Sequence, residues 1–177
     1  MKRQDFDHVV RAAGAILGER EVLVIGSQAV HASMPEPLPE EAERSVEADV
    51  VAFDDADGRK ADLIDGTIGE ASMFQESFGI YAQGVSEKTA YLPVGWRDRL
   101  VRYETPATAG VVAWCLELHD LWISKAIAGR PKDREFCGAL LARQVVDREI
   151  LRHRALEVPE AGPGSRDRVL AWVNSIG

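Results

Sequence analysis

The sequence has only two cysteines, Cys115 and Cys137, among its 177 residues. Two thiols are too few for a disulfide framework, and both lie in apolar patterns that predict helices, so we expect them to be reduced and buried, as in a cytoplasmic protein. No stretch approaches the ~18 consecutive apolar residues that a membrane span needs. The opening residues carry charges where a signal peptide has its apolar core, so we expect no membrane association.

Histidine is scarce as well, and the four histidines do not combine with the cysteines at the spacing of a zinc site. Basic residues are outnumbered, since 21 Lys and Arg face 29 Asp and Glu and leave a net charge of −8. This balance disfavours non-specific coating of nucleic acid. The charge is uneven, however, because residues 125–154 carry 8 basic and 4 acidic side chains, a net of +4. That segment is either a local basic face that holds phosphates or a solvated helix surface.

The apolar pattern changes along the chain from mixed to purely helical. It predicts an α/β core over residues 1–113 and a C-terminal helical segment over 114–177, packed on the core as one compact unit. We expect strands over 21–25, 45–53, 78–84 and 96–104, a short helix over 28–32, and longer helices over 6–17, 59–70, 118–129, 132–145, 147–156 and 165–175.

A Gly-Ser pair, Gly26-Ser27, ends the first apolar strand and precedes the short helix. Ser27 is a natural helix cap, and the free N–H groups and dipole of a helix start attract phosphate. Glycine lets an anion approach the backbone, and the serine hydroxyl adds a donor. A strand-to-helix turn without any ligand is the alternative for this pair.

Two carboxylates, Glu47 and Asp49, lie two positions apart in the second predicted strand. Both therefore leave the same face, and they repel each other unless a cation or a proton neutralises them. Asp and Glu oxygens are the ligands that Mg²⁺ prefers. The alternative is an edge strand with its acidic face in water.

The order of these features resembles the nucleotidyltransferase fold of the DNA polymerase beta superfamily, which places Gly-Ser or Gly-Gly before a helix and paired acidic residues on the next strand. Here that strand reads Arg-Ser-Val-Glu-Ala-Asp over residues 44–49. The chain is more similar still to bacterial nucleotidyltransferase-like proteins of the abortive-infection and toxin–antitoxin type. These carry a later helix with Lys followed by Arg-x-Lys-Asp, and the segment from His119 to Asp133 has this form. The likeness spans about residues 20–145.

The resemblance implies an α/β (α+β) fold, with a mixed sheet flanked by helices, and an activity that needs Mg²⁺ or Mn²⁺ and an NTP. It implies metal binding by Glu47 and Asp49, and catalytic roles for these two together with Lys125 and Asp133. The residues that it assigns to the nucleotide are Gly26, Ser27, Arg44, Lys125, Arg130 and Lys132.

The later segment has a physical rationale of its own. Lys125 lies on a predicted helix, where its ammonium group could reach a phosphate as a compact point charge. Arg130 and Lys132 follow at the helix break, and Asp133 could cap or neutralise this cluster or reach the metal. Alternatively, the segment joins two helices and its charges are simply exposed.

Active members of the superfamily usually have a third carboxylate on a later strand. Glu104 is the candidate here, and Asp98 is a weaker one, but neither lies in a recognisable motif. Gln83-Gly84 occurs in a stretch that is typical of the same bacterial families, without a chemical role that we can assign. We expect Tyr81 to pack in the core.

These observations predict a Mg²⁺-dependent nucleotidyltransferase that transfers NMP from an NTP to a hydroxyl of RNA, particularly a tRNA end, or of a protein. By analogy it would be the toxin of a bacterial toxin–antitoxin pair, with a cognate antitoxin as a partner. The alternative is a non-catalytic descendant of the fold that binds a nucleotide or a protein. A metal-dependent phosphohydrolase or nuclease is a third interpretation.

Overall fold

The computed structural model describes residues 1–159 and 164–175, and within them it has a mixed α/β fold, as the sequence predicts. The strands of this part form one sheet in the order β3-β2-β1-β5-β4. The central strand β1 is parallel to β5 and antiparallel to β2, whereas β2 is parallel to β3 and β4 is antiparallel to β5. The bounds are β1 (Glu21–Val24), β2 (Glu47–Val51), β3 (Tyr81–Gly84), β4 (Val101–Tyr103) and β5 (Val112–Cys115).

The strand directions decide which ends of the strands meet. Because β1 and β2 are antiparallel, with Val24 opposite Val50, the C-terminal end of β1 lies beside the N-terminal end of β2. The pairing continues beyond β1, since the backbone N–H of Ile25 donates to the carbonyl oxygen of Asp49 over 3.2 Å. The C-terminal end of β5, from which the later helices begin, lies at the same end of the sheet.

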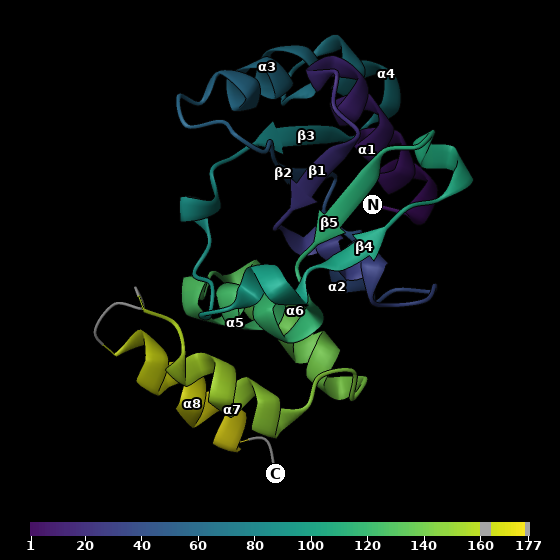
Figure 1. The fold of residues 1–177 in the computed structure, drawn as a ribbon. Helices are drawn as coiled ribbons and strands as arrows, with labels where there is room; N and C mark the ends of the chain where they lie inside the picture. The colour runs from purple at the N-terminus through teal and green to yellow at the C-terminus, as the bar shows by residue number, and fades with distance from the viewer. Residues whose placement is uncertain (160–163, 176–177) are drawn as a thin grey trace.

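Helices lie in two groups around the sheet (Figure 1). The first helix contacts β1, β2 and β3 as well as α3, and α3 packs on β3. The helices α5 to α8 gather at one end of the sheet, at the bottom of Figure 1. The α-helices are α1 (Arg3–Leu17), α2 (Glu40–Glu43), α3 (Arg59–Ile68), α4 (Met73–Phe78), α5 (Leu118–Ala128), α6 (Pro131–Ala142), α7 (Arg148–Leu156) and α8 (Ser165–Ser175). Short 3-10 helices are η1 (Ser27–Ala32), η2 (Glu87–Thr89), η3 (Trp96–Arg99) and η4 (Pro106–Thr108).

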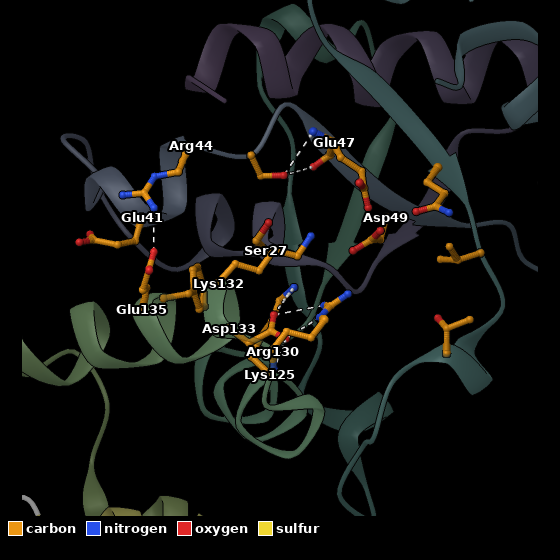
Figure 2. A pocket seen from close by; sticks show the side chains of 15 residues that line it. Ser27, Glu41, Arg44, Glu47, Asp49, Lys125, Arg130, Lys132, Asp133 and Glu135 are labelled. Atoms are coloured by element: carbon orange, nitrogen blue, oxygen red, sulfur yellow. Dashed lines mark hydrogen bonds and ion pairs between the residues drawn. The ribbon is translucent and has the colours of Figure 1, made fainter. Parts of the chain in front are cut away.

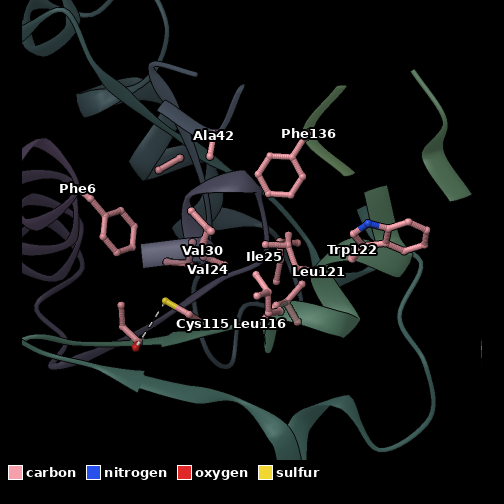
Figure 3. Packing of buried hydrophobic residues seen from close by; sticks show 14 of the residues in the cluster. Phe6, Val24, Ile25, Val30, Ala42, Cys115, Leu116, Leu121, Trp122 and Phe136 are labelled. Carbon is pink, nitrogen blue, oxygen red and sulfur yellow. Dashed lines mark hydrogen bonds between the residues drawn. The ribbon is translucent and has the colours of Figure 1, made fainter. Parts of the chain in front are cut away.

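One cluster of buried apolar side chains joins the sheet to the later helices (Figure 3). Phe6 of α1 lies in it, stacked on the buried imidazole of His31 at 4.9 Å between ring centroids. At the other end, fully buried Trp122 of α5 donates its indole N–H to the carbonyl oxygen of Cys137 over 3.0 Å. Its ring also lies 5.1 Å from that of Trp172 in α8. This shared core holds α5, and with it the residues that α5 carries, in a set position relative to the sheet.

Several predicted elements are confirmed closely. The first helix ends at Gly18, which adopts the left-handed conformation (φ 68°) that glycine tolerates at a helix end. Helix α5 ends at Gly129 in the same way (φ 67°). Both cysteines are buried and free, as expected, and no helix within the described residues is long and apolar enough to cross a membrane.

Other elements differ from the sequence prediction. Ser27 does not cap a helix, because η1 is a short 3-10 helix whose cap position is Gly26 and whose first residue is Ser27. Phe78 ends the unpredicted helix α4, and residues 96–99 form η3 ahead of the short strand β4. Cys115 lies in strand β5 and not in a helix, because its apolar neighbours form a sheet interior. Residues 160–163, 176 and 177 of the predicted C-terminal segment lie outside the described residues.

Candidate functional site

The turn after β1 is shaped by a close contact between two chain segments. A Cβ atom built on Gly26 would overlap Oδ2 of Asp49 and lie 2.6 Å from its Cγ, so any side chain at residue 26 would have to displace the Asp49 carboxylate. The backbone of Gly26 is extended (φ −89°), so the requirement is for space and not for an unusual conformation. The absence of a side chain at residue 26 leaves the Asp49 carboxylate free to lie against the turn.

Glu47 and Asp49 project from the same face of β2, as their spacing predicts. Burial and, after it, the neighbouring Glu47 carboxylate raise the pKa of Asp49 from 3.8 to about 6. Burial also acts to raise the pKa of Glu47, but hydrogen bonds with Asp49 and Tyr81 and the charges of Lys132 and Lys125 outweigh it, so this pKa lies below its ordinary value. The pair therefore holds a proton only below about pH 6, and above that pH the two adjacent negative charges favour a bound cation.

The hydroxyl of Tyr81 donates to Oε2 of Glu47 over 2.9 Å. Tyr81 lies directly opposite Glu47 in the parallel pairing of β2 and β3. This contact replaces our expectation of simple core packing, and it fixes the orientation of the Glu47 carboxylate. Only the register between β2 and β3 could have revealed it, because nothing in the local sequence around Tyr81 distinguishes it from a packing residue.

A cluster of positive charge faces the acidic pair from α5 and from the start of α6 (Figure 2). Its centre is Asp133, which is 1% exposed. The guanidinium of Arg130 donates to both oxygens of Asp133, over 2.6 and 3.2 Å, and the Nζ atom of Lys125 lies 3.5 Å from Oδ1. Burial would raise the pKa of Asp133, but the hydrogen bonds from Arg130 and the charge of Lys125 hold it below its ordinary value. Asp133 thus positions both cations, the capping and neutralising role that its sequence context suggested.

A cavity of about 370 Å³ brings these groups together. Glu47 and Asp49 line one side, Lys125, Arg130 and Lys132 line another, and Ser27 lies between them in Figure 2. The proximity of Lys132 to the acidic pair is also evident from its effect on both carboxyl pKa values. Most of the residues singled out from two distant stretches of sequence therefore converge on one cavity. The polar side chains Gln83 and Thr89 also line it, and the sequence interpretation had assigned them no role.

Arg44 lines the same cavity but is engaged elsewhere. Its Nη1 atom pairs with Oε2 of Glu135 over 2.7 Å, which bridges α2 and α6 at the edge of the site (Figure 2). A weaker pair with Glu40, at 3.8 Å, lies one helical turn away. In this arrangement Arg44 ties two helices together.

Glu104 does not join the acidic pair, contrary to the expectation of a third carboxylate. Strand β4 is antiparallel to β5, so the chain leaves β4 at the opposite end of the sheet from the cavity. There Glu104 pairs with Arg102 and lines a separate cavity with Glu21. Asp98, the weaker candidate, lies in η3 and does not line the cavity of the acidic pair either.

Without Glu104 and Asp98, the acidic side chains left for a metal ion are Glu47 and Asp49. They suit one divalent cation and would fill only part of its coordination shell. No group of three or more His, Cys, Asp or Glu side chains within residues 1–159 and 164–175 has the arrangement of a metal centre. Two adjacent carboxylates, beside a glycine that leaves the space open, nevertheless fit Mg²⁺ or Mn²⁺. Mg²⁺ is commonly held by one or two carboxylates together with substrate phosphates and water, so the cations across the cavity complete a plausible environment for a metal–triphosphate complex.

Comparison with known proteins agrees with this geometry. Residues 5–171 match the family described as nucleotidyltransferase of unknown function (DUF6036). The match covers nearly the whole chain, so the chain belongs to this family. No curated protein and no solved structure matches it.

Proposed function

We propose that this member of the nucleotidyltransferase family transfers NMP from an NTP to a hydroxyl group, with Mg²⁺ or Mn²⁺ as the metal. The observation that carries the proposal is the single cavity in which Glu47 and Asp49 face Lys125, Arg130 and Lys132. A carboxylate pair and a cation cluster are the two parts that a metal–triphosphate complex requires. The family match supports the class of reaction, and the residues support where it would occur.

In this proposal each group has one task. Glu47 and Asp49 hold the metal ion, which supplies charge stabilisation at the α-phosphate when it is bound. Ser27 and the backbone after Gly26 contact the β- and γ-phosphates. Lys125 and Arg130, both held by Asp133, neutralise the negative charge that develops on the leaving pyrophosphate. The acceptor hydroxyl would lose its proton to water and its oxygen would bond to the α-phosphorus, while the bond from that phosphorus to the α,β-bridging oxygen would break and release pyrophosphate.

The acceptor in our proposal is a hydroxyl of RNA, particularly a tRNA end, or of a protein. The net positive charge of residues 125–154 supports an RNA acceptor, because this segment begins at the cavity. By analogy with toxin–antitoxin proteins, the chain would act as a toxin that a cognate antitoxin restrains.

The test is incubation of the purified protein with Mg²⁺ and each labelled NTP, together with total tRNA or cell lysate. Label on RNA or protein that is lost in Asp49→Asn would support transfer and identify the acceptor class. A matched control is Asp98→Asn, an exposed carboxylate that does not line the cavity. Label that moves equally well in Asp49→Asn would exclude Asp49 as a metal ligand.

A second candidate function is nucleotide binding without turnover. It is favoured by one specific observation, the position of Glu104 away from the acidic pair, which leaves two carboxylates where active relatives usually have three. A thermal-shift series with Mg²⁺ and each NTP separates the two. Stabilisation by an NTP without label transfer would identify a binding protein, and transfer would exclude this alternative.

A further inference from the structure

Gln83 occupies a position next to the acidic pair that the proposed chemistry does not use. It lies on β3 opposite Asp49 in a parallel pairing, so both side chains share one face of the sheet about 5 Å apart. Its side chain is exposed, and its amide forms no hydrogen bond with any part of the chain that the structure describes. A free amide beside a carboxylate pair, inside the candidate cavity, is available to a ligand.

The distribution of charge in the cavity favours one orientation of a bound nucleotide. Lys125, Arg130 and Lys132 line the side formed by α5 and α6, so the β- and γ-phosphates belong there. The wall that β3 and the following segment contribute, with Gln83, Val85 and Thr89, carries no charge. If a metal ion at Glu47 and Asp49 held the α-phosphate with its pyrophosphate toward the cations, the 5′ oxygen and the ribose after it would lie on the side of this neutral wall.

The order of groups in the nucleotide then determines whether Gln83 contacts the ribose or the base. The ribose follows the α-phosphate directly, whereas the base comes one group later. Since Gln83 is the neighbour of Asp49, its side chain reaches the ribose before it could reach the base. An amide offers both a donor and an acceptor, which suits a ribose hydroxyl that can also do both.

Gln83 and Glu47 also line a second cavity, of about 540 Å³. Carboxylates of Asp65 and Glu70 line that cavity, and no basic side chain does. Gln83 thus stands at the junction of two cavities, and only the first has cations for a triphosphate. Its amide is a neutral hydrogen-bonding group directly beside the acidic pair.

We propose that Gln83 is a specificity-determining residue that hydrogen-bonds a ribose hydroxyl of the nucleotide and so distinguishes ribonucleotides from deoxyribonucleotides. This inference rests on the proposed nucleotide site. Loss of one neutral hydrogen bond weakens binding about 3- to 10-fold, so this is the expected discrimination against the deoxy analogue that lacks the contacted hydroxyl.

The experiment measures equilibrium binding, in the presence of Mg²⁺, of ATP, 2′-deoxy-ATP, 3′-deoxy-ATP and inorganic tripolyphosphate to the full chain. Wild type should bind ATP about 3- to 10-fold more tightly than one of the deoxy analogues. Gln83→Met, which keeps the side-chain length and loses the amide, should bind ATP as weakly as that analogue and leave tripolyphosphate affinity unchanged. Gln4→Met, the same substitution at an exposed position of α1, is the control.

The outcomes separate this inference from the proposal on which it rests. Absence of both ATP and tripolyphosphate binding in wild type would exclude the nucleotide site itself. ATP binding with equal affinity for both deoxy analogues, or discrimination that survives in Gln83→Met, would overturn the role of Gln83 alone. Where turnover is measurable, Gln83→Met should raise KM for ATP more than it lowers kcat, and a change in kcat alone would also contradict the inference.

Discussion

The carboxylate of Asp49 lies where the side chain of residue 26 would begin, and residue 26 is glycine. Gly26 lies in the turn that follows β1, and Asp49 lies on β2, the antiparallel neighbour of β1. Their contact joins the turn that carries Ser27 to the strand that carries the acidic pair. A metal held by Asp49 would therefore lie close to any phosphate held at that turn.

Gly26→Ala should damage the site without unfolding the protein. The added methyl group has to displace the Asp49 carboxylate, an overpacking that costs about 1–3 kcal/mol of stability. Displacement of a metal ligand by a fraction of an ångström or more should reduce nucleotide transfer by about 100-fold. Thermal unfolding and the labelling assay measure the two effects.

The matched control for that variant is Gly66→Ala, in α3, where a Cβ meets no atom within 4 Å. It should raise stability by about 0.5–1 kcal/mol, because alanine favours a helix over glycine. It should leave transfer unchanged. Equal activity of the two variants would contradict the role given to the contact between Gly26 and Asp49.

Asp49→Asn should make the metal-free protein more stable at high pH. The pKa of Asp49 in the folded protein, about 6, lies above its ordinary value of 3.8, so its contribution to stability is full below pH 3.8 and is lost as the pH rises through 6. Asparagine cannot ionise and avoids that loss. Tm measured without metal should therefore favour the variant above pH 7 and show a smaller difference at pH 4.5, and a pH-independent difference would refute the assignment.

Lys125→Ala should weaken NTP binding. The Lys125 side chain is only 13% exposed, and its ammonium group is held near Asp133 at the cavity. Its loss therefore removes a charge-assisted contact with phosphate worth about 1.5–3 kcal/mol, or about 10- to 150-fold in Kd. Lys88→Ala, which changes an exposed lysine outside this cavity, serves as the control. Isothermal titration calorimetry with an NTP and Mg²⁺ measures the Kd of each variant. Equal affinities of Lys125→Ala and Lys88→Ala would show that Lys125 does not contact the nucleotide.

An RNA acceptor should bind with a marked dependence on salt. If a few phosphates contact the basic side chains of residues 125–154, the affinity for RNA should fall about tenfold or more between 50 and 200 mM salt. The reason is that binding releases the counterions condensed on the RNA, and this release is less favourable at higher salt. Fluorescence anisotropy with a labelled tRNA provides the measurement. A flat response would favour a protein acceptor.

His31 should make the fold sensitive to acid. Burial lowers the pKa of its imidazole to about 4, from an ordinary value of 6.5, so its stabilising contribution is present above pH 6.5 and is lost as the pH falls toward 4. This loss can reach about 3 kcal/mol, since one pKa unit corresponds to 1.36 kcal/mol. Urea unfolding of wild type and His31→Gln between pH 7 and 4.5 should show the steeper decline in wild type, and parallel declines would exclude His31 as the cause.

Local sequence patterns were sufficient for the elements that bear the site. The spacing of Glu47 and Asp49 in a β-rich stretch placed both on one strand face, and a strand face is set by the alternation of side chains within a few residues. The helix that carries Lys125 and its end at Gly129 followed from apolar periodicity and from the conformational freedom of glycine. These predictions depend on neighbours along the chain and are confirmed.

The partners of those residues depended on tertiary structure. Tyr81 meets Glu47 only because β3 pairs with β2 in one register, and Glu104 lies at the far end of the sheet only because β4 is antiparallel to β5. Likewise, the pairing of Arg44 with Glu135 requires α2 and α6 to pack side by side.

The sequence by itself thus determined the kind of the elements that carry the acidic pair and Lys125, the strand face on which the acidic pair lies, and the family to which the chain belongs, whereas it missed β5 and α4. The order, direction and register of the strands, which bring the acidic pair, Gly26 and the cations of α5 and α6 into one cavity, were decided by tertiary structure. The physical reason is that helix and strand periodicity arises from the local backbone geometry. Strand pairing instead arises from hydrogen bonds and packing between segments far apart in the chain, which no local pattern records.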